Sequence, residues 1–333
     1  MAINSITHVI LTGGVGSRLW PLSRKNLPKQ YLELFDGESL FEKTVARNEK
    51  VSNKTIVVGN IENYQLSDKS MSKFNKSYLH IVEAVPRNTA AAIAFAAFAS
   101  EPDDILLITP SDHVIEGTEK YQAALHEAIV LAEKDYLVTF GIKPTKPETG
   151  YGYIEFEKED VIAFHEKPDL ETATGYLKEG NYFWNSGLFC FKARKFLTEL
   201  EKQEPEVYWK SKKAWESNKD GLLDFELSLS IPSISIDYAV MERSKDIKVV
   251  PTYFDWSDLG SFESVYDYLV QKDHPIDENK NIVIGTSTHT TFIGVKNCIL
   301  IYTSDALMVL QKENSQEVKK VYQQLESIAS PLL

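Results

Sequence analysis

Residues 13–30 read GGVGSRLWPLSRKNLPKQ, and they follow an apolar run at residues 8–11 that has the composition of a buried strand. The stretch contains three glycines and four fixed cations, and the first acidic residue of the protein, Glu33, comes after it. A glycine-rich turn after a strand lets backbone N–H groups approach phosphate oxygens, because no Cβ atom stands between them. Arginine and lysine supply the opposite charge. The pattern therefore predicts a site for a polyphosphate at the end of the first strand.

The glycine spacing alone is not specific. It would also suit an ordinary surface turn, and Leu19 stands where a dinucleotide-binding fingerprint has its third glycine. No Gly-Lys-Ser/Thr sequence closes a P-loop in this stretch either. The full string, in which glycines, cations and prolines occur together, is a far more specific sign of a binding site than the glycine spacing alone.

The composition of the 333 residues is that of an ordinary globular protein. The chain contains neither a run of about 18 apolar residues nor a signal-type opening, so we expect no membrane span and a place in the cytoplasm. Its two cysteines, Cys190 and Cys298, are far apart in sequence and fit a reducing compartment without disulfides. The net charge of −12 argues against nucleic acid as a partner.

Short apolar runs alternate with helix-like segments through the first two thirds of the chain. The predicted strands are 8–11, 55–58, 79–82, 105–109 and 136–141. The predicted helices between them are 39–50, 88–100 and 119–134. This alternation predicts a Rossmann-like α/β fold with a mixed, mostly parallel sheet covered on both faces. In such sheets ligands bind beyond the carboxyl ends of the strands.

The pattern becomes less regular after residue 150 and changes again after about residue 275. Strands are predicted at 151–156 and 182–192, and helices at 192–202, 205–218 and 261–269. Short β-rich runs then follow at 282–285, 291–294, 298–301 and 307–310, before a final helix at 315–328. We therefore predict a catalytic domain over 1–272 and a small β-helix-like domain over 273–333. The apolar β-rich tail also suggests assembly into a homodimer.

Two aspartates are candidates for metal binding. Asp112 comes just after the apolar run 105–109, so it lies at the carboxyl edge of the sheet, where a metal-bound triphosphate would lie. It could equally cap a helix or form an Asx turn. Asp258, in the sequence WSDLG, could be the N-cap of the helix at 261–269 or lie one turn before it.

The opening motif resembles that of the sugar-nucleotide pyrophosphorylases, and RLWPLSR at 18–24 is most similar to the mannose-1-phosphate guanylyltransferases among them. Further segments follow in the order of that family, so the resemblance covers about residues 8–270. They are TPSDH at 109–113, TGYGYI at 149–154, EKP at 166–168, WNSGLF at 184–189 and SIDYAVME at 235–242. The segment 83–91 departs from the commoner family form, because Ala84 and Ala91 replace prolines.

The resemblance implies a reaction between GTP and mannose 1-phosphate, with Mg²⁺ as cofactor, that gives GDP-mannose and diphosphate. It implies metal binding by Asp112 and Asp258, and catalytic roles for both together with Arg18, Lys29 and Lys167. The implied nucleotide-binding residues are Leu11, Gly13, Gly14, Gly16, Ser17, Arg18, Lys29, Glu83, Asn88, Thr89 and Asp112. The implied sugar-binding residues are Gly150, Glu166, Lys167, Asn185 and Asp258.

Two alternatives stay open at this point. One is another sugar-1-phosphate nucleotidyltransferase, which would use dTTP or UTP with glucose 1-phosphate. The other is a non-catalytic relative that binds a sugar nucleotide and regulates a partner. No Gly-x-Ser-x-Gly motif or helical histidine pair supports a hydrolase. We expect no mannose-6-phosphate isomerase activity, because the sequence ends before the isomerase domain of longer family members.

Overall fold

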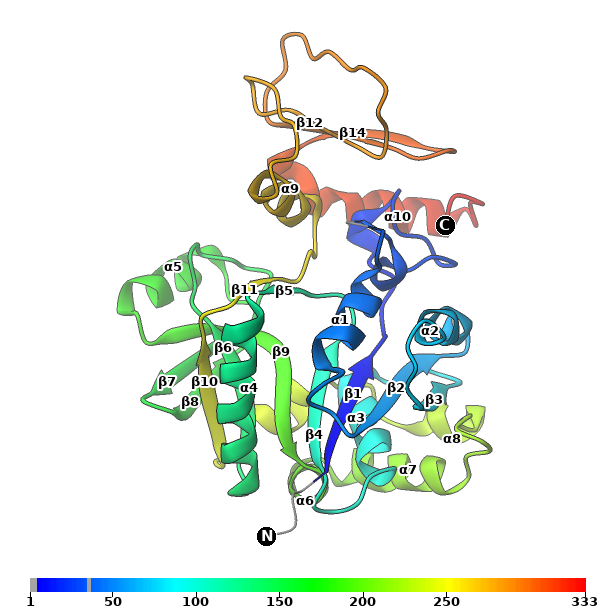
Figure 1. Cartoon of the computed structure of the whole chain (residues 1–333), viewed down its shortest axis with the longest axis vertical. Coiled ribbons are helices and arrows are strands. Elements are labelled where there is room, and N and C mark those ends of the chain that lie inside the picture. The colour runs from blue at the N-terminus through cyan, green and yellow to red at the C-terminus, as the bar shows by residue number, and fades with distance from the viewer. Residues whose placement is uncertain (1–4, 35–36) are drawn as a thin grey trace. The chain divides into compact units, whose positions relative to one another are not determined.

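The computed structural model describes residues 5–34 and 37–333, and its chain divides into two units (Figure 1). The first unit consists of Met1–Gly13, Thr44–Ser111 and Ile115–Trp256. The second unit consists of Gly14–Lys43, Asp112–Val114 and Ser257–Leu333. The glycine-rich opening motif therefore leaves the first unit after its first strand and belongs to the second.

A mixed sheet of nine strands forms the centre of the first unit, in the order β3-β2-β1-β4-β9-β6-β10-β8-β7. Strands β3, β2, β1 and β4 are mutually parallel, and so are β6 and β10. The long strand β9 runs antiparallel between β4 and β6. The bounds are β1 (Ile6–Leu11), β2 (Lys54–Asn60), β3 (Leu79–Glu83), β4 (Ile105–Pro110), β6 (Leu137–Ile142), β7 (Tyr153–Glu157), β8 (Asp160–His165), β9 (Tyr182–Lys192) and β10 (Ile247–Thr252).

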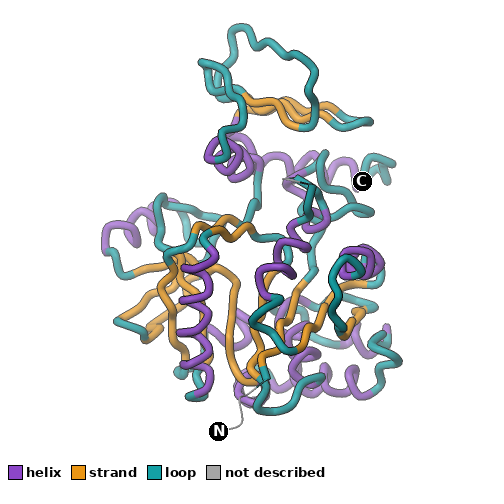
Figure 2. Tube along the Cα trace, in the orientation of Figure 1, coloured by secondary structure: helices purple, strands orange, loops and turns teal. Residues whose placement is uncertain are grey.

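Helices cover both faces of this sheet, as Figure 2 shows. The alanine-rich α3 (Asn88–Phe98) packs on the face that carries Leu106 and Ile108, and α4 (Thr118–Glu133) packs on the face that carries Leu107. Adjacent residues of β4 therefore belong to different cores, because side chains alternate along a strand. The remaining helices of this part are α1 (Leu40–Asn48), α2 (Tyr64–Met71), α5 (Leu170–Glu179), α6 (Ala193–Gln203), α7 (Pro205–Glu216) and α8 (Phe225–Ser230). The short strands β5 (Val114–Glu116) and β11 (Asp255–Ser257) pair with each other. The predicted mixed α/β fold is confirmed.

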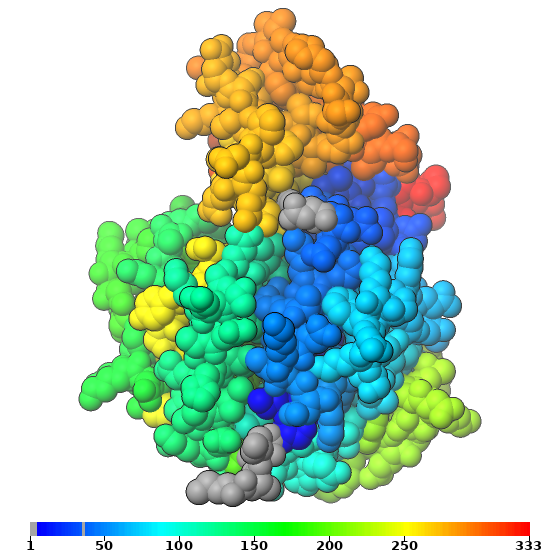
Figure 3. All heavy atoms as spheres, in the orientation of Figure 1, coloured from blue at the N-terminus to red at the C-terminus, as the bar shows by residue number. Residues whose placement is uncertain are grey.

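The second unit joins the opening motif to the end of the chain. Its elements are α9 (Phe262–Gln271), β12 (Ile282–Ile284), β13 (Cys298–Tyr302), β14 (Leu307–Gln311) and α10 (Val318–Ser327). Leu19 and Trp20 share a core with Phe262 of α9 and Ile299 of β13. The Trp20 indole N–H donates to the carbonyl of Leu332 at 2.9 Å, and Figure 3 shows the blue opening segment beside the red chain end.

Some predicted elements differ from the structure. The residues 291–294 form no strand, and they lie on a largely exposed segment where Ile293 is 88% accessible. The predicted helix at 88–100 ends two residues earlier, at Phe98, and its N-cap is Arg87. The last helix starts at Val318, after a 3₁₀ turn over Lys312–Glu317. No helix in the described part of the chain has the length and apolar character that a membrane span requires.

Candidate functional site

The opening loop of the second unit is shaped around one lysine. Gly16 has a φ of 75°, and a Cβ atom on it would lie 2.6 Å from Cβ of Lys29. The Lys29 backbone N–H donates to the carbonyl of Val15 at 3.2 Å, which closes the loop. Only glycine satisfies both the left-handed conformation and the close approach. A Cβ on Gly13 or Gly14 would meet no atom within 4 Å, so the outer part of the loop is open to a ligand.

Lys29 lies between the two predicted metal ligands. This residue is only 4% exposed, and its Nζ lies 2.9 Å from Oδ2 of Asp112. The same ammonium donates to the main-chain carbonyl of Asp258. One buried cation thus links two aspartates that are far apart in sequence. An ammonium has three N–H donors, so a third remains for another acceptor.

The electrostatic environment keeps Asp112 ionised. Burial opposes the charge, but the Lys29 ammonium and then His113 attract it, and the net result holds the pKa of the Asp112 carboxyl below its ordinary value. The His113 Nε2 lies 3.7 Å from Oδ1 of Asp112. Asp112 lies two residues after Pro110, the last residue of β4. It is therefore a charged acceptor at the carboxyl end of a central strand.

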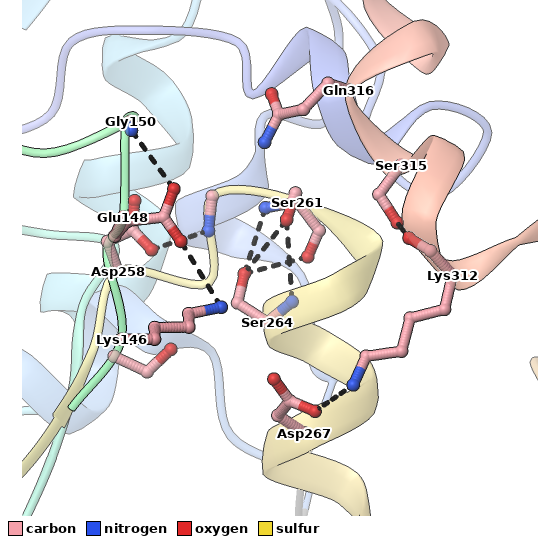
Figure 4. A network of polar contacts seen from close by, with 12 residues as sticks. Lys146, Glu148, Gly150, Asp258, Ser261, Ser264, Asp267, Lys312, Ser315 and Gln316 are labelled. Carbon is pink, nitrogen blue, oxygen red and sulfur yellow. Dashed lines mark hydrogen bonds and ion pairs between the residues drawn. The ribbon is translucent and has the colours of Figure 1, made fainter. Parts of the chain in front are cut away.

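Asp258 lies before a capped helix and does not cap that helix itself. The N-cap of α9 is Ser261, which forms a reciprocal capping box with Ser264 (Figure 4). The Oδ1 of Asp258 accepts from the Gly260 N–H at 3.0 Å. The turn 258–260 and the capping box together fix the direction in which the chain carries Asp258 into α9.

Asp112 and Asp258 supply two carboxylates to the second unit of the chain. In the described residues, no group of three or more His, Cys, Asp or Glu side chains could hold a metal ion. Mg²⁺ prefers one or two carboxylates, with phosphate oxygens and waters as its other ligands. Asp112 and Asp258 match this donor set.

Arg18 keeps its charge available for an anion. Its Nη1 donates to the neutral amide oxygen of Gln316 at 3.2 Å. Ser17, also half-buried, opens the same 3₁₀ turn, Ser17–Leu19. The second unit therefore contains two of the three predicted catalytic cations, both aspartates, and Gly14 and Gly16 of the predicted site.

The first unit contains the other predicted nucleotide-binding residues. Leu11 ends β1 and Glu83 ends β3, and both strands are parallel neighbours of β2. Glu83 is 6% exposed, and its Oε1 has no hydrogen-bond partner. Burial raises the pKa of this carboxyl to about 8, although the Arg87 backbone N–H opposes the shift. A buried polar atom without a partner is costly, so Glu83 is suited to meet a donor from a ligand.

Asn88 and Thr89 hold the start of α3. Asn88 is exposed with a φ of 70°, and its side-chain oxygen accepts from the Thr89 N–H at 2.8 Å. The Thr89 hydroxyl accepts from the Ile236 N–H at 2.9 Å. Both residues therefore have local structural contacts, and Thr89 connects α3 to the segment 235–242.

Two of the predicted sugar-binding residues meet at a glycine. A Cβ on Gly152 would lie 2.7 Å from Oε2 of Glu166 and 3.6 Å from Cβ of Asn185. Lys167 has a φ of 45° and an exposed side chain, and its ammonium bonds to Oε1 of Glu166. Glu166, Lys167 and Asn185 thus form one polar group, where the missing side chain of Gly152 leaves room.

Gly150 is not part of that group by any direct contact. Its N–H donates to Oε1 of Glu148 at 3.0 Å, and Glu148 pairs with Lys146 at 3.3 Å (Figure 4). A residue that sequence reasoning gave no role joins the group instead. Asp237 accepts a hydrogen bond from Asn185 at 2.8 Å. Its only signal in the sequence was its place in the motif at 235–242.

Comparisons with known proteins identify the family of this chain. Residues 7–273 match the family model described as nucleotidyl transferase, and residues 275–325 match a MannoseP isomerase/GMP-like beta-helix domain. The mannose-1-phosphate guanylyltransferase RfbM of Salmonella typhimurium is 39% identical over 349 residues, which cover 97% of this chain and 73% of that protein.

Two solved structures are also similar. One, described as a mannose-1-phosphate geranyltransferase from Thermus thermophilus, is 28% identical with a TM-score of 0.84, over 97% of this chain and all of that one. Another, described as a mannose-6-phosphate isomerase from Helicobacter pylori, is 37% identical with a TM-score of 0.70, over 76% of this chain and 99% of that one. Nucleotidyltransferases generally use a divalent metal ion. The chain is an enzyme that belongs to the nucleotidyl transferase family.

Proposed function

We infer that this enzyme is a mannose-1-phosphate guanylyltransferase. An oxygen of mannose 1-phosphate attacks the α-phosphorus of GTP in line, the bond to the β-phosphate breaks, and GDP-mannose and diphosphate leave. One phosphoanhydride replaces another, so no covalent enzyme intermediate is needed. The observation that carries the proposal is the buried Lys29, which holds Asp112 and Asp258 together beside a glycine loop. The names of relatives such as RfbM supply the substrates.

We propose Mg²⁺ as the metal, held by Asp112 and Asp258. When bound, it would offset charge on the α-phosphate and on the incoming sugar phosphate. The third donor of Lys29 and the guanidinium of Arg18 bind the triphosphate. The backbone N–H groups of the opening loop, from Gly13 and Gly14 to Gly16 and Ser17, surround its oxygens.

The base and the sugar are recognised by residues of the first unit. Guanine presents N–H donors, and the unpartnered Oε1 of Glu83 is an acceptor for them, at the edge of the sheet where β1 also ends with Leu11. We also propose that Asn88 and Thr89 bind the nucleotide. Glu166, Asn185 and Gly150 face the sugar hydroxyls, while Lys167 exchanges its bond to Glu166 for the sugar phosphate.

We further propose a catalytic domain over 1–272, a C-terminal domain over 273–333, a homodimer and a cytoplasmic location. The dimer proposal is supported by the outer face of the three-stranded sheet, where Leu307 and Val309 are 61% and 55% exposed. The absence of a membrane-spanning helix in the described residues is consistent with the location.

The test is diphosphate release measured with each of four nucleoside triphosphates and several sugar 1-phosphates. We expect GTP with mannose 1-phosphate to be the best pair, with no turnover in EDTA and recovery on adding Mg²⁺. Asp112→Asn and Arg18→Ala should each lower kcat by about 10²-fold or more, the usual effect of removing one charge-stabilising group. A preference for dTTP or UTP would indicate another sugar-1-phosphate nucleotidyltransferase instead. No diphosphate release with any pair would favour a non-catalytic binding protein. Fructose 6-phosphate formation from mannose 6-phosphate is measured as a negative control.

A further inference from the structure

Asp237 accepts a hydrogen bond from Asn185, one of the predicted sugar-binding residues. It opens a π-helical turn, Asp237–Met241, on the segment that follows α8. Its Oδ1 accepts from Nδ2 of Asn185, 52 residues earlier in the chain, at 2.8 Å. Asn185 lies in the middle of β9, so the bond connects a rigid strand to this turn.

The amide of Asn185 is held at both ends. Its Oδ1 accepts from the Gly187 N–H at 3.1 Å and from the Thr139 hydroxyl at 3.4 Å. Its Nδ2 donates to Asp237. Because the carboxylate of Asp237 only accepts hydrogen bonds, it pairs with the NH₂ group of Asn185 and not with the amide oxygen. An asparagine amide has two nitrogen-bound hydrogens, so one remains when Asp237 accepts the other. The network therefore fixes where the remaining hydrogen points.

This arrangement is electrostatically unfavourable for Asp237. Burial raises the pKa of its carboxyl, and the nearby charge of Glu166 raises it further. Two carboxylates at close range in a buried place are expensive, and proteins keep such conflicts mainly at functional sites. A neutral acceptor at position 237 would remove the repulsion from Glu166 and could still accept the hydrogen bond from Asn185.

We propose that Asp237 is a positioning residue of the sugar subsite, which turns the Asn185 amide so that its second Nδ2 hydrogen is presented to a hydroxyl oxygen of the sugar phosphate. Glu166, beside Gly152, then accepts from a neighbouring hydroxyl. The inference rests on the proposed function, because that function assigns Asn185 and Glu166 to the sugar.

The first experiment separates KM for the sugar phosphate from KM for the nucleotide. Asp237→Ala should raise KM for mannose 1-phosphate about tenfold, the scale of one lost hydrogen bond, with KM for GTP unchanged. Asp237→Asn should restore KM to within about threefold of wild type, because its carbonyl can accept the same bond. Glu242→Gln is the matched control, since Glu242 is an exposed acid near Asp237 and Glu166, and it should leave both KM values unchanged.

A double-mutant cycle then tests whether Asp237 acts through Asn185. In an Asn185→Ala background, Asp237→Ala should change KM for mannose 1-phosphate by less than about twofold. Equal effects in both backgrounds, or equal losses with Asp237→Asn and Asp237→Ala, would overturn the proposal.

A spectroscopic readout decides the question even if the proposed reaction fails. With ¹⁵N-labelled asparagine, the side-chain amide signals of Asn185 are assigned by comparison with Asn185→Ala. Asp237→Ala should move these signals while Asp237→Asn leaves them close to wild type, and added mannose 1-phosphate or glucose 1-phosphate should move the same signals. Signals of Asn185 that respond to neither change contradict the inference, whatever the diphosphate assay shows.

Discussion

The Lys29 ammonium bonds to two acceptors, the Asp112 carboxylate and the main-chain carbonyl of Asp258, and the residue is almost fully buried. Replacing it by methionine keeps the shape of the side chain but removes the ammonium beside Asp112. The main charge that opposes the burial of that carboxylate would then be missing, and a donor to the triphosphate would be lost as well. We predict that Lys29→Met lowers kcat by about 10²–10³-fold in steady-state diphosphate release.

The control for this prediction is Lys25→Met, in the same segment. Lys25 pairs with Glu326 at 2.9 Å, and the two side chains are 48% and 52% exposed, so the pair contributes little. Its kcat should stay within about twofold of wild type. Similar decreases of kcat in both variants would contradict the prediction, because they would not depend on the charge of Lys29.

Glu83 makes the stability of the ligand-free protein depend on pH. The pKa of its carboxyl is raised from an ordinary value of 4.5 to about 8 in the fold. Between these values the folded state keeps a proton that the unfolded state has released, so this group lowers the free energy of unfolding as pH rises. Glu83→Gln removes that loss.

We therefore predict that Glu83→Gln becomes progressively more stable relative to wild type from pH 5 to pH 8, as measured by urea unfolding at several pH values. The gain should be no more than a few kcal/mol, at about 1.4 kcal/mol for each unit of pKa shift. A difference between the two proteins that is the same at every pH would mean that Glu83 does not hold its proton in the fold.

At the scale of an element, the opening loop depends on Gly16. Gly16→Ala would place a residue with a Cβ in left-handed backbone, which costs about 1–2 kcal/mol, and would push on Cβ of Lys29 at 2.6 Å. We predict a loss of stability of at least this size together with a lower kcat, since Lys29 must move. Unfolding in urea and diphosphate release measure the two effects.

Gly175→Ala is the matched glycine control. Gly175 lies inside α5, and a Cβ on it would meet nothing within 4 Å. Alanine should stabilise this helix by about 0.5–1 kcal/mol without changing kcat. If Gly16→Ala behaved in the same way, the loop would not be shaped around Lys29.

The elements that could be predicted from the sequence are those with strong local patterns. The apolar run at 105–109 and the acid after it indicated where Asp112 lies, because a buried strand and its end leave a clear signature. The residues 291–294, with two apolar side chains and a glycine, have a weaker pattern, and the strand predicted there was wrong. Pairing partners are a long-range property, and local composition does not contain them.

The candidate site shows the same limit. The glycines, cations and aspartates could be chosen from the motifs, but the buried contact of Lys29 with Asp112 needs two segments folded against each other. The bond from Asn185 to Asp237 also needs the tertiary fold.

At the scale of the whole molecule, the outer face of the C-terminal sheet raises the question of assembly. Along β14, Met308 and Leu310 pack inward, while Leu307 and Val309 point outward and are 61% and 55% exposed. Tyr302, directly opposite Leu307 on β13, is 44% exposed on the same face. A contiguous apolar face on an edge strand is costly in water and typical of a contact surface.

We predict that the wild-type protein is a dimer of the 37.8 kDa chain in light scattering at micromolar concentration. Leu307→Lys with Val309→Lys should give the monomer mass, because each buried lysine would lose its solvation without gaining a partner. Ile162→Lys is the control, since Ile162 is 56% exposed on β8 of the first unit and should leave the mass unchanged. A wild-type monomer would remove the proposed dimer, and a dimer that survives the double substitution would place its interface on another face.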